Sequence, residues 1–477
     1  MNRLINRTIR LVFGIVCMTM LFAACSKDEP TSSLKLDAAA LFIPAWGGSA
    51  SVGFTTENIS LVKAIRMPEG WTVAVDMATN TIRVTAPAAA GDKISEKGEI
   101  SFVGYAYEGI GSTAELFVSI KQPQDLTAEG KQANSFIVST PDAFYQFDAQ
   151  HKGETTEAVD AHRAELLWQT ATELVQYVKL DNGKVGFYVG ADADGKLIDG
   201  NAVIGVYNAQ NEIVWSWHIW ITAAAPEKNT VTLGGKTFMG FNLGALKNAN
   251  ATPAEILFSY GLYYQWGRKD PFVEPNTYNA EQGIDAYMYS AEGKKVLLSY
   301  VASVSTIGTM EYATKNPRHF ILGVADSKYD WLFTAHSNTL WAEAKTVNDP
   351  CPKGWRVPSK NDFAGLTIAD DLTAPVSQYA QKYGWTLTDG TTSAFFLGAG
   401  RRTYMTGKIH NVYNPLPRSE EEAQPWEGLY WTTGSDADTR ASAFYFYLNY
   451  TDVAHSGVNA AVPYQRANGM QIRCVKI

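Results

Sequence analysis

The sequence predicts a mostly β protein with an α+β C-terminal part: two small β-sandwiches followed by a large loop-rich region. Apolar and polar residues alternate over short runs in residues 34–122 and again in residues 131–225, and turn residues interrupt these runs at regular spacing. Such a pattern is typical of sandwich strands. Residues 226–477 show little periodicity, and glycines and aromatic residues are spread through them. A chain of 477 residues is also too long for one core, so we expect three domains.

The first 24 residues have the features of a signal peptide. Three arginines precede an apolar run at residues 11–22, which is too short for a comfortable membrane span. The run ends in Ala23-Ala24-Cys25, which resembles a bacterial lipobox, although Phe22 stands where leucine is usual. The resemblance implies that the chain is cleaved before Cys25 and carries a lipid there, anchored to the membrane without spanning it. A plain signal peptide is the alternative.

Residues 25–33 are predicted to form a polar tether. Its acidic pair, Asp28 and Glu29, resembles the signal that sends lipoproteins of the Bacteroidetes to the outer face of the outer membrane. A solvated tether that carries no address is the alternative. We therefore expect a lipid-anchored protein of the outer membrane that faces the cell exterior.

Cys351 and Cys474 are predicted to form a disulfide. Of the four cysteines, Cys17 leaves with the signal peptide and Cys25 is lipidated, so one pair remains in an exported, oxidising compartment. The bridge would close a loop of about 120 residues, which adds roughly 5 kcal/mol of stability in the chain-entropy model. After Pro358, Ser359 and the acidic residue three positions later predict the start of a short helix.

Residues 34–122 are predicted to form the first sandwich, which is Ig-like in size. The expected inward-facing residues are Val52, Phe54, Trp71, Val73, Val75, Ile82, Val84, Ile100, Phe102, Leu116, Val118 and Ile120, with a turn at residues 109–111. Residues 67–71 together with residues 84–87 resemble the Ig-like modules that follow lipid anchors in Bacteroidetes surface proteins. That resemblance implies a spacer, and glycan binding by this module is the alternative.

Residues 131–225 are predicted to form the second sandwich, after a linker at residues 123–130. We expect strands at residues 134–139, 164–169, 185–189, 201–206 and 213–221. Asp181-Asn182-Gly183 predicts a tight hairpin, because asparagine and glycine accept positive φ. Alternation in the last strand places Trp215, Trp217 and Ile219 on one face and His218 and Trp220 on the other. Core filling is the usual role of such tryptophans, and a sugar-stacking platform is the alternative.

Residues 226–477 contain five blocks whose order resembles a known family. The blocks are residues 231–245, 261–272, 349–359, 428–434 and 473–475, and the most specific one contains Cys351-Pro352-Lys353-Gly354-Trp355-Arg356-Val357-Pro358. They resemble the Fibrobacter succinogenes major paralogous domain, which is abundant in Bacteroidetes surface lipoproteins. The resemblance implies a variant of the C-type-lectin-like fold, rich in loops and with its two termini side by side. Gly240-Phe241 departs from the Asp-Arg common in the family, which weakens a polar role for that turn.

Tryptophans and arginines recur inside these blocks, and we interpret them as residues that hold the core together. Buried tryptophan needs a partner for its N–H group, and arginine stacks on rings or pairs with carboxylates. The residues are Trp266, Trp355, Trp431, Arg268, Arg356 and Arg473.

The tripeptide Glu274-Pro275-Asn276 also serves calcium-dependent sugar binding in true C-type lectins. Those lectins add a Trp-Asn-Asp strand downstream, and the nearest analogue here, residues 347–349, leads directly into Cys351. We therefore interpret the tripeptide as a turn.

Several kinds of chemistry find no support in the sequence. The net charge of −8 disfavours nucleic acid as a partner. The seven histidines show no zinc-ligand spacing, residues 192–195 lack the further oxygen ligands of a calcium loop, and no nucleophile elbow or Walker loop occurs. We expect no metal, no other cofactor and no catalytic residue. A pair of carboxylates for glycoside hydrolysis stays open, because sequence gives no separation between side chains.

Three hypotheses about function follow. The first is a non-enzymatic surface lipoprotein that acts in cell adhesion or in the assembly of fimbrial or other surface components. The second is a glycan-binding lipoprotein of a polysaccharide uptake system, and the third is a carbohydrate-active enzyme. The partners would be the membrane, through the lipid, and a surface glycan or a fimbrial protein. The sequence does not identify ligand-binding residues; the aromatic, asparagine-containing segment at residues 445–450 is the loop we would test first.

Overall fold

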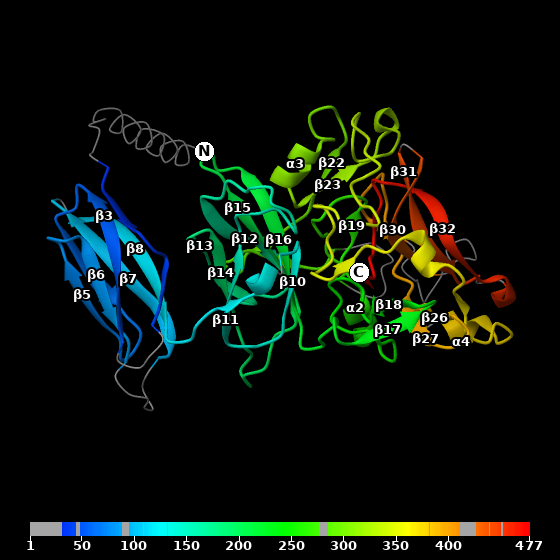
Figure 1. Cartoon of the computed structure of the whole chain (residues 1–477), viewed down its shortest axis with the longest axis horizontal. Helices are drawn as coiled ribbons and strands as arrows, with labels where there is room; N and C mark the ends of the chain where they lie inside the picture. Colours follow the sequence, from blue (N-terminus) through cyan, green and yellow to red (C-terminus); the bar gives the residue numbers. More distant parts are fainter. Residues whose placement is uncertain are drawn as a thin grey trace, which may run out of the picture. The chain divides into compact units, whose positions relative to one another are not determined.

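The computed structural model describes residues 31–43, 48–87, 95–107, 109–130, 132–276, 285–380, 382–410, 426–437, 439–449 and 452–477. The predicted signal peptide, Cys25 and Tyr450 lie outside the described residues. The chain divides into two compact units, Met1–Lys121 and Gln122–Ile477. The fold is mostly β, as the sequence predicts (Figure 1).

The first unit is a β-sandwich of two four-stranded sheets. One sheet has the order β1 (Ser33–Leu36), β3 (Ser49–Glu57), β6 (Thr81–Thr85) and β5 (Thr72–Asp76); the other has β2 (Ala40–Phe42), β8 (Gly109–Ser119), β7 (Lys97–Ala106) and β4 (Leu61–Arg66). The inner faces form one core, and Ile82, Ile100 and Phe102 in it are fully buried. The turn predicted at residues 109–111 is wrong, because Gly109 already begins β8 and pairs with Ala106.

The second unit begins with a sandwich that the sequence also predicts. One sheet has the order β13 (Val175–Asp181), β14 (Lys184–Val189), β11 (Ala143–Asp148) and β9 (Gln124–Asp125), and the 3-10 turn η1 (Ala128–Gly130) follows β9. The facing sheet contains β10 (Ser135–Val138), β16 (Ile213–Ile221), β15 (Gly200–Tyr207) and β12 (Arg163–Gln169). The hairpin at Asn182-Gly183 is confirmed, with φ of 48° and 75° and Asp181 opposite Lys184.

Strand β16 has the alternation that the sequence predicts. Trp215, Trp217 and Ile219 face the core between the two sheets of the sandwich, whereas Trp220 belongs to the core of the loop-rich region. His218 is buried on the same side as Trp220. Trp215, Trp217 and Trp220 are at most 4% exposed, so core filling is confirmed and the sugar platform at these residues is wrong.

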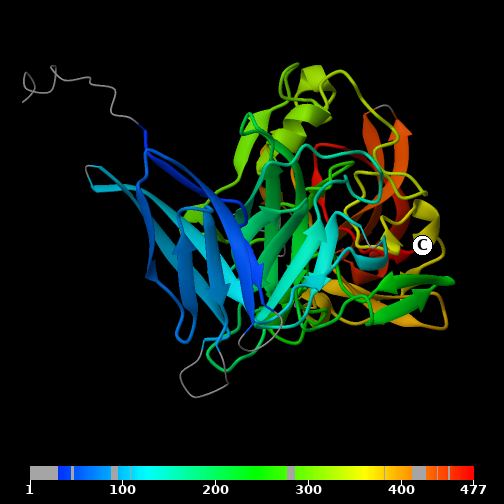
Figure 2. The same ribbon diagram turned by 60° about the vertical axis from the view of Figure 1, so that its left-hand side comes forward.

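The loop-rich region consists of many short elements (Figure 2). Two of its sheets have four strands: one has the order β17 (Thr230–Leu233), β18 (Lys236–Met239), β34 (Val475–Lys476) and β24 (Trp355–Arg356), and the other has β19 (Tyr264–Gln265), β33 (Gly469–Met470), β28 (Arg401–Arg402) and β29 (Ile409–His410). Two more have three strands: β25 (Thr367–Ile368), β26 (Gly384–Thr388) and β27 (Ser393–Leu397) form one, and β30 (Glu427–Ala437), β31 (Arg440–Tyr447) and β32 (Gly457–Gln465) form the other. A fifth sheet pairs β22 (Ser299–Ala302) with β23 (His319–Leu322). Its helices are α2 (Pro253–Ser259), α3 (Met310–Lys315) and α4 (Val376–Ala380), with 3-10 turns η2 (Ala325–Ser327), η3 (Lys360–Phe363) and η4 (Val453–His455).

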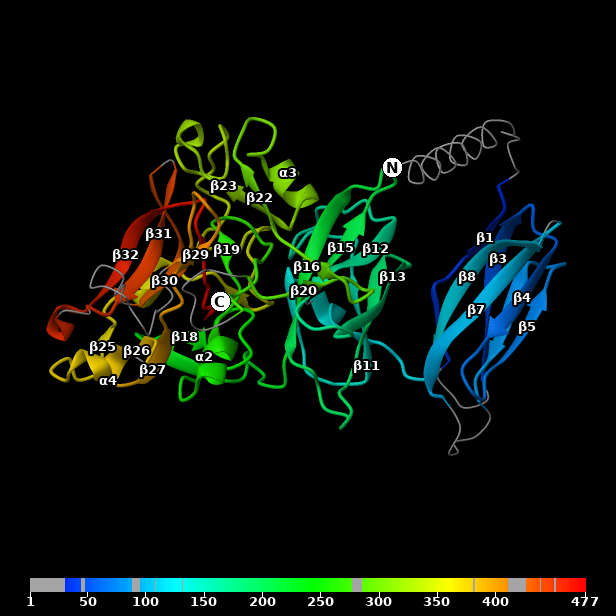
Figure 3. The ribbon, with the colours of Figure 1, turned by 180° about the vertical axis from the view of Figure 1, so that it is seen from behind.

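The second sandwich and the loop-rich region share both a sheet and a core. The short strands β20 (Met288–Tyr289) and β21 (Lys295–Val296) come from the loop-rich region, and β20 pairs with the edge of β12, so the facing sheet has six strands (Figure 3). Trp168, Val203 and Trp220 of the sandwich pack into the core of the loop-rich region. The predicted limit at residue 225 therefore falls inside one compact unit.

The end of the chain is held by pairing on both sides. Strand β34 lies between β18, near the start of the loop-rich region, and β24, which follows Cys351. Pairing on both edges satisfies backbone groups that would otherwise fray at a chain end. The start and the end of this region therefore lie side by side, as the resemblance implies.

Candidate functional site

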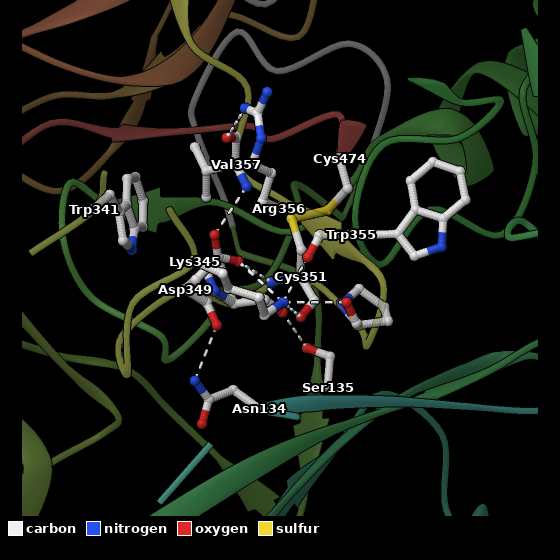
Figure 4. The surroundings of a disulfide bond; sticks show 12 residues. Asn134, Ser135, Trp341, Lys345, Asp349, Cys351, Trp355, Arg356, Val357 and Cys474 are labelled. Atoms are coloured by element: carbon white, nitrogen blue, oxygen red, sulfur yellow. Dashed lines mark hydrogen bonds and ion pairs between the residues drawn. A yellow bond between two sulfur atoms is a disulfide. The ribbon is translucent and has the colours of Figure 1, made fainter. Parts of the chain in front are cut away.

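The two cysteines that the sequence pairs are joined in the structure (Figure 4). Cys351 and Cys474 are separated by 123 residues, their Cα atoms lie 6.0 Å apart, and both side chains are fully buried. The bridge links the segment before β24 to the segment before β34. It therefore fastens the same terminal strand that the sheet pairing holds.

Asp349 organises the backbone next to the disulfide. Its Oδ1 accepts a hydrogen bond from the Cys351 N–H at 2.8 Å, and its Oδ2 accepts one from the Val357 N–H at 2.9 Å. The Lys345 ammonium lies 3.5 Å from Oδ1 and donates to the carbonyl oxygens of Cys351 and Trp355. Burial raises the pKa of Asp349, and the nearby ammonium opposes that shift. The side chains of Asp349 and Lys345 therefore hold the backbone around the disulfide.

A cavity of about 380 Å³ lies where the second sandwich meets the loop-rich region. The sandwich contributes Thr170 and Ala171, which follow β12, and Asp199, which precedes β15. The remaining lining residues come from the loop-rich region: Gly244, Leu246, Leu257, Phe258, Tyr260, Glu274, Pro275, Asn276, Ala286, Tyr287 and Tyr289. Its size and its mixture of aromatic and polar groups suit a small-molecule ligand.

The walls of this cavity are held by bonds between the two parts. The Asn201 side-chain amide donates to the Gly244 carbonyl oxygen at 2.8 Å, and the Trp220 indole N–H donates to the Ala245 carbonyl oxygen at 3.0 Å. Gly244 has a φ of +87°, and a Cβ atom there would approach Leu262 to 2.6 Å. A side chain at this position would therefore disturb the wall.

The polar side of the cavity is formed by Glu274-Pro275-Asn276, the tripeptide interpreted as a turn from the sequence. Pro275 pairs with Asp285, and the Ala286 N–H donates to the Glu274 carbonyl oxygen at 2.8 Å. The turn interpretation overlooked that Glu274 and Asn276 line a cavity. Burial raises the pKa of Glu274 to about 7, although the Arg402 guanidinium opposes that shift.

A second cavity, of about 490 Å³, lies between the same two parts near α3. Several of its charged lining residues are paired with one another, such as Lys152 with Glu157 and Lys315 with Glu311 at 2.8 Å. Trp215 also lines it and is 4% exposed. With its ionic groups paired and its aromatic ring covered, this cavity offers a ligand fewer contacts than the first.

No protein-family model matches the chain, and no curated protein matches it either. Among solved structures, the D00-D0 domain of intimin is 12% identical, with 39% of this chain and 96% of that chain covered and a TM-score of 0.15. The adhesin InvE of Yersinia pseudotuberculosis is 11% identical over 93% of this chain and 97% of that chain, with a TM-score of 0.14. The human desmocollin-1 ectodomain is 7% identical over 40% and 41%, with a TM-score of 0.16. Similarities of this size carry no argument about function.

The tryptophans and arginines interpreted as core residues are buried, with one exception. Trp266, Trp355, Trp431, Arg268 and Arg473 are at most 6% exposed. Arg473 donates to Asn242 Oδ1 at 3.0 Å and lies over the Phe396 ring at 4.3 Å. Arg356 is partly exposed and pairs with Asp362 at 2.9 Å.

The segment proposed for ligand contact, residues 445–450, is not the loop that the sequence predicts. Its residues up to Tyr447 belong to strand β31, where Tyr445 and Tyr447 stack on each other with ring centroids 5.4 Å apart. In the described residues, no group of three or more histidine, cysteine, aspartate or glutamate side chains is placed to hold a metal ion. No helix in the described part of the chain is long and apolar enough to cross a membrane.

Proposed function

We propose that the protein is a non-enzymatic lipoprotein of the outer membrane that acts in adhesion or in the assembly of surface components. It is held by a lipid at Cys25 and faces the cell exterior, and the first unit serves as a spacer. Its binding part is residues 122–477, in which the loop-rich region is a member of the Fibrobacter succinogenes major paralogous family.

The cavity between the second sandwich and the loop-rich region carries this proposal. Its walls come from two parts that share a sheet and a core, so the cavity is built before any ligand arrives. A preformed site loses little conformational freedom on binding. The buried carboxylates of Asp349 and Asp362 accept structural hydrogen bonds from backbone N–H groups, so their role is to hold the fold.

The test is an attachment assay with cells that lack the gene and are complemented with variants of the full chain. Wild type and Cys17→Ala should incorporate labelled fatty acid, be cleaved by protease added to intact cells, and restore attachment to host cells or to partner bacteria. Cys25→Ala should fail in all three, because it removes the lipidation site while Cys17→Ala changes only the signal peptide. Labelling of the Cys25→Ala variant, or unchanged attachment after deletion, would contradict the proposal. Loss of growth on a polysaccharide with attachment intact would point instead to glycan uptake.

A further inference from the structure

The first unit carries exposed apolar side chains at the end where β7 turns into β8. Tyr107 follows β7 and is fully exposed, and Ile110 of β8 is 69% exposed. Ile110 pairs with Tyr105, and Tyr105 pairs with Leu61 of β4, which is 39% exposed. Residues directly opposite each other in antiparallel strands lie on the same face of a sheet. Leu61, Tyr105 and Ile110 therefore form a row across three strands, and we call this row together with Tyr107 the apolar tip.

The row lies on the outer face of its sheet. Val62, which follows Leu61 in β4, is 2% exposed and belongs to the sandwich core. Successive side chains of a strand point to opposite faces, so Leu61 points away from that core. An exposed group of apolar side chains marks a surface that contacts another protein or a membrane.

The chain enters the first unit at the same end. The Asn58 side-chain amide donates to the Thr31 carbonyl oxygen at 2.8 Å, and Thr31 precedes β1. A Cβ atom at Gly111, the neighbour of Ile110, would lie 2.7 Å from the Cβ atom of Ser32. The first described residues of the chain therefore lie beside the apolar tip.

The chain leaves the first unit at the opposite end. Strand β8 begins at the apolar tip and runs over 11 residues to Ser119, close to the end of the unit at Lys121 (Figure 3). At a rise of about 3.4 Å per residue, this strand spans roughly 34 Å. The end with the apolar tip is therefore the one nearer to the proposed lipid at Cys25.

The segment between the lipid and the first unit is short. Thr31 lies six positions after Cys25, and a fully extended chain of that length spans at most about 22 Å. The headgroup layer on each side of a bilayer is roughly 5–8 Å thick. The tether thus lets the apolar tip reach the lipid surface and keeps it at a high local concentration there.

The residue types at this end suit the boundary between lipid and water. Tyrosine is enriched at that boundary, because its ring is apolar and its hydroxyl is polar. Glu57 is exposed and pairs with Ser33, the first residue of β1. A carboxylate is costly in the hydrocarbon core, so this residue limits the depth of contact to the headgroup layer.

We propose that the apolar tip rests on the lipid surface in which the Cys25 lipid is anchored. The contact fixes which end of the first unit faces the membrane, and the chain continues from the end that points away. The inference rests on the proposed function, because the lipid at Cys25 brings the tip to the membrane. It makes the first unit a spacer with a defined footing.

Fluorescence quenching of the full-length lipoprotein on vesicles tests the inference. Ser60→Cys places a thiol beside Leu61, and Glu69→Cys places one beyond the far end of β4; both positions are exposed. Cys351 and Cys474 are joined in the disulfide, so a thiol-reactive fluorophore labels the introduced cysteine. Each protein is inserted into preformed phosphatidylcholine vesicles, with or without a phosphatidylcholine that carries a spin label on its headgroup. Flotation of the vesicles shows that the protein is anchored.

The spin label should quench the fluorophore at position 60 at least about threefold more than the one at position 69. An apolar surface at the membrane boundary lies roughly 5–10 Å deep, whereas the far end of the unit is tens of ångströms away. Tyr107→Ser together with Ile110→Ser, in the Ser60→Cys protein, should lower the quenching at least about twofold, because the apolar contact is lost.

Ile65→Ser together with Met67→Ser is the matched control. These residues are 60% and 45% exposed, so this variant also removes two exposed apolar side chains, but at the other end of β4. In the Ser60→Cys protein it should leave the quenching unchanged. The melting temperature of each variant shows that it is folded.

Three results with protein that floats with the vesicles would overturn the inference alone. They are equal quenching at positions 60 and 69, unchanged quenching after loss of Tyr107 and Ile110, and an equal decrease in the control variant. A second copy or another protein that covers the tip would give the first result. Protein that does not float refutes the lipid anchor and the inference together. Quenching as predicted, in a protein whose gene is dispensable for attachment, refutes the adhesion role alone.

Discussion

The side-chain amide of Asn134 donates a hydrogen bond to the backbone carbonyl oxygen of Asp349 at 2.9 Å, across 215 residues of sequence. The same amide nitrogen donates to Val347 O at 2.7 Å, and its Oδ1 accepts from the Trp215 indole at 3.1 Å. One asparagine directly before β10 thus joins the second sandwich to the segment that enters the disulfide (Figure 4). Asn134 is 2% exposed, so this joint between the two parts is buried.

Replacing Asn134 by alanine should destabilise the second unit by about 3 kcal/mol, because buried partners lose their hydrogen bonds. Urea unfolding of the full-length protein, followed by tryptophan fluorescence, measures the change. Asn361→Ala is the matched control, since Asn361 is exposed and should lie within about 0.5 kcal/mol of wild type. Equal stability of the two variants would show that the Asn134 bonds contribute nothing to the joint.

Removing the disulfide with Cys351→Ser and Cys474→Ser together should cost about 2–5 kcal/mol, because the long loop regains its freedom in the unfolded chain. Thermal unfolding with and without a thiol reductant measures the effect. The reductant should lower the melting temperature of wild type toward that of the double variant, and should leave the variant unchanged. The prediction is wrong if the wild-type disulfide stays intact in the reductant and wild type still melts no higher than the double variant.

His218 should make the protein less stable in mild acid. Burial lowers its folded pKa to about 3 from an ordinary 6.5, so the unfolded chain binds a proton between these values and the folded chain does not. The stability from the neutral histidine is present above pH 6.5 and falls by about 1.4 kcal/mol for each pH unit below it. The stability difference between wild type and His218→Asn should shrink accordingly when unfolding is measured from pH 8 to pH 4.5. A constant difference would mean that the imidazole is not buried as a neutral group.

Glu274 should make the protein less stable as the pH rises from 4.5 to 7. Its folded pKa of about 7 lies above the ordinary 4.5, so the folded chain holds a proton between these values that the unfolded chain releases. The contribution to stability is fully present below pH 4.5 and is lost as the pH rises to 7. Glu274→Gln should therefore gain about 1.4 kcal/mol on wild type for each pH unit over this window. An unchanging difference between the two proteins would place the carboxyl group in water.

The sequence predicts the parts of this fold that local chemistry determines. Asn182-Gly183 forms its hairpin because both residues accept positive φ, and the tryptophans of β16 alternate because one face meets the sandwich core. Ser359 N and Oγ both donate to Asp362 Oδ2, so the expected start of a helix is present, but as the short 3-10 turn η3.

Strands that are buried on both faces, or bent, lack the alternation of apolar and polar residues from which a strand is predicted. In β11, Ala143, Phe144 and Tyr145 are consecutive buried residues, so apolar and polar positions do not alternate. In β13, the register shifts between Gln176 and Lys179, and Tyr177 has a φ of 53°. Two-residue strands such as β24 and β34 form only because segments distant in the sequence pair with each other. They are too short to show the apolar–polar alternation that predicts a strand.

The candidate site could not be placed from the sequence for the same reason. Its lining joins Thr170 to Glu274 and Tyr287, which come together through the pairing of β12 with β20. The only local signal was the tripeptide at Glu274, and a turn explains it equally well. What distinguishes it is that Glu274 and Asn276 line a cavity together with residues of the second sandwich, which only the packed structure reveals.

The cavity exists only if residues 122–477 behave as one body, and calorimetry of the full-length protein tests that claim most directly. We predict two unfolding transitions, one for each compact unit, with Asn134→Ala and loss of the disulfide lowering the larger transition as a whole. Three transitions, with the second sandwich melting independently of the loop-rich region and unaffected by loss of the disulfide, would contradict the account.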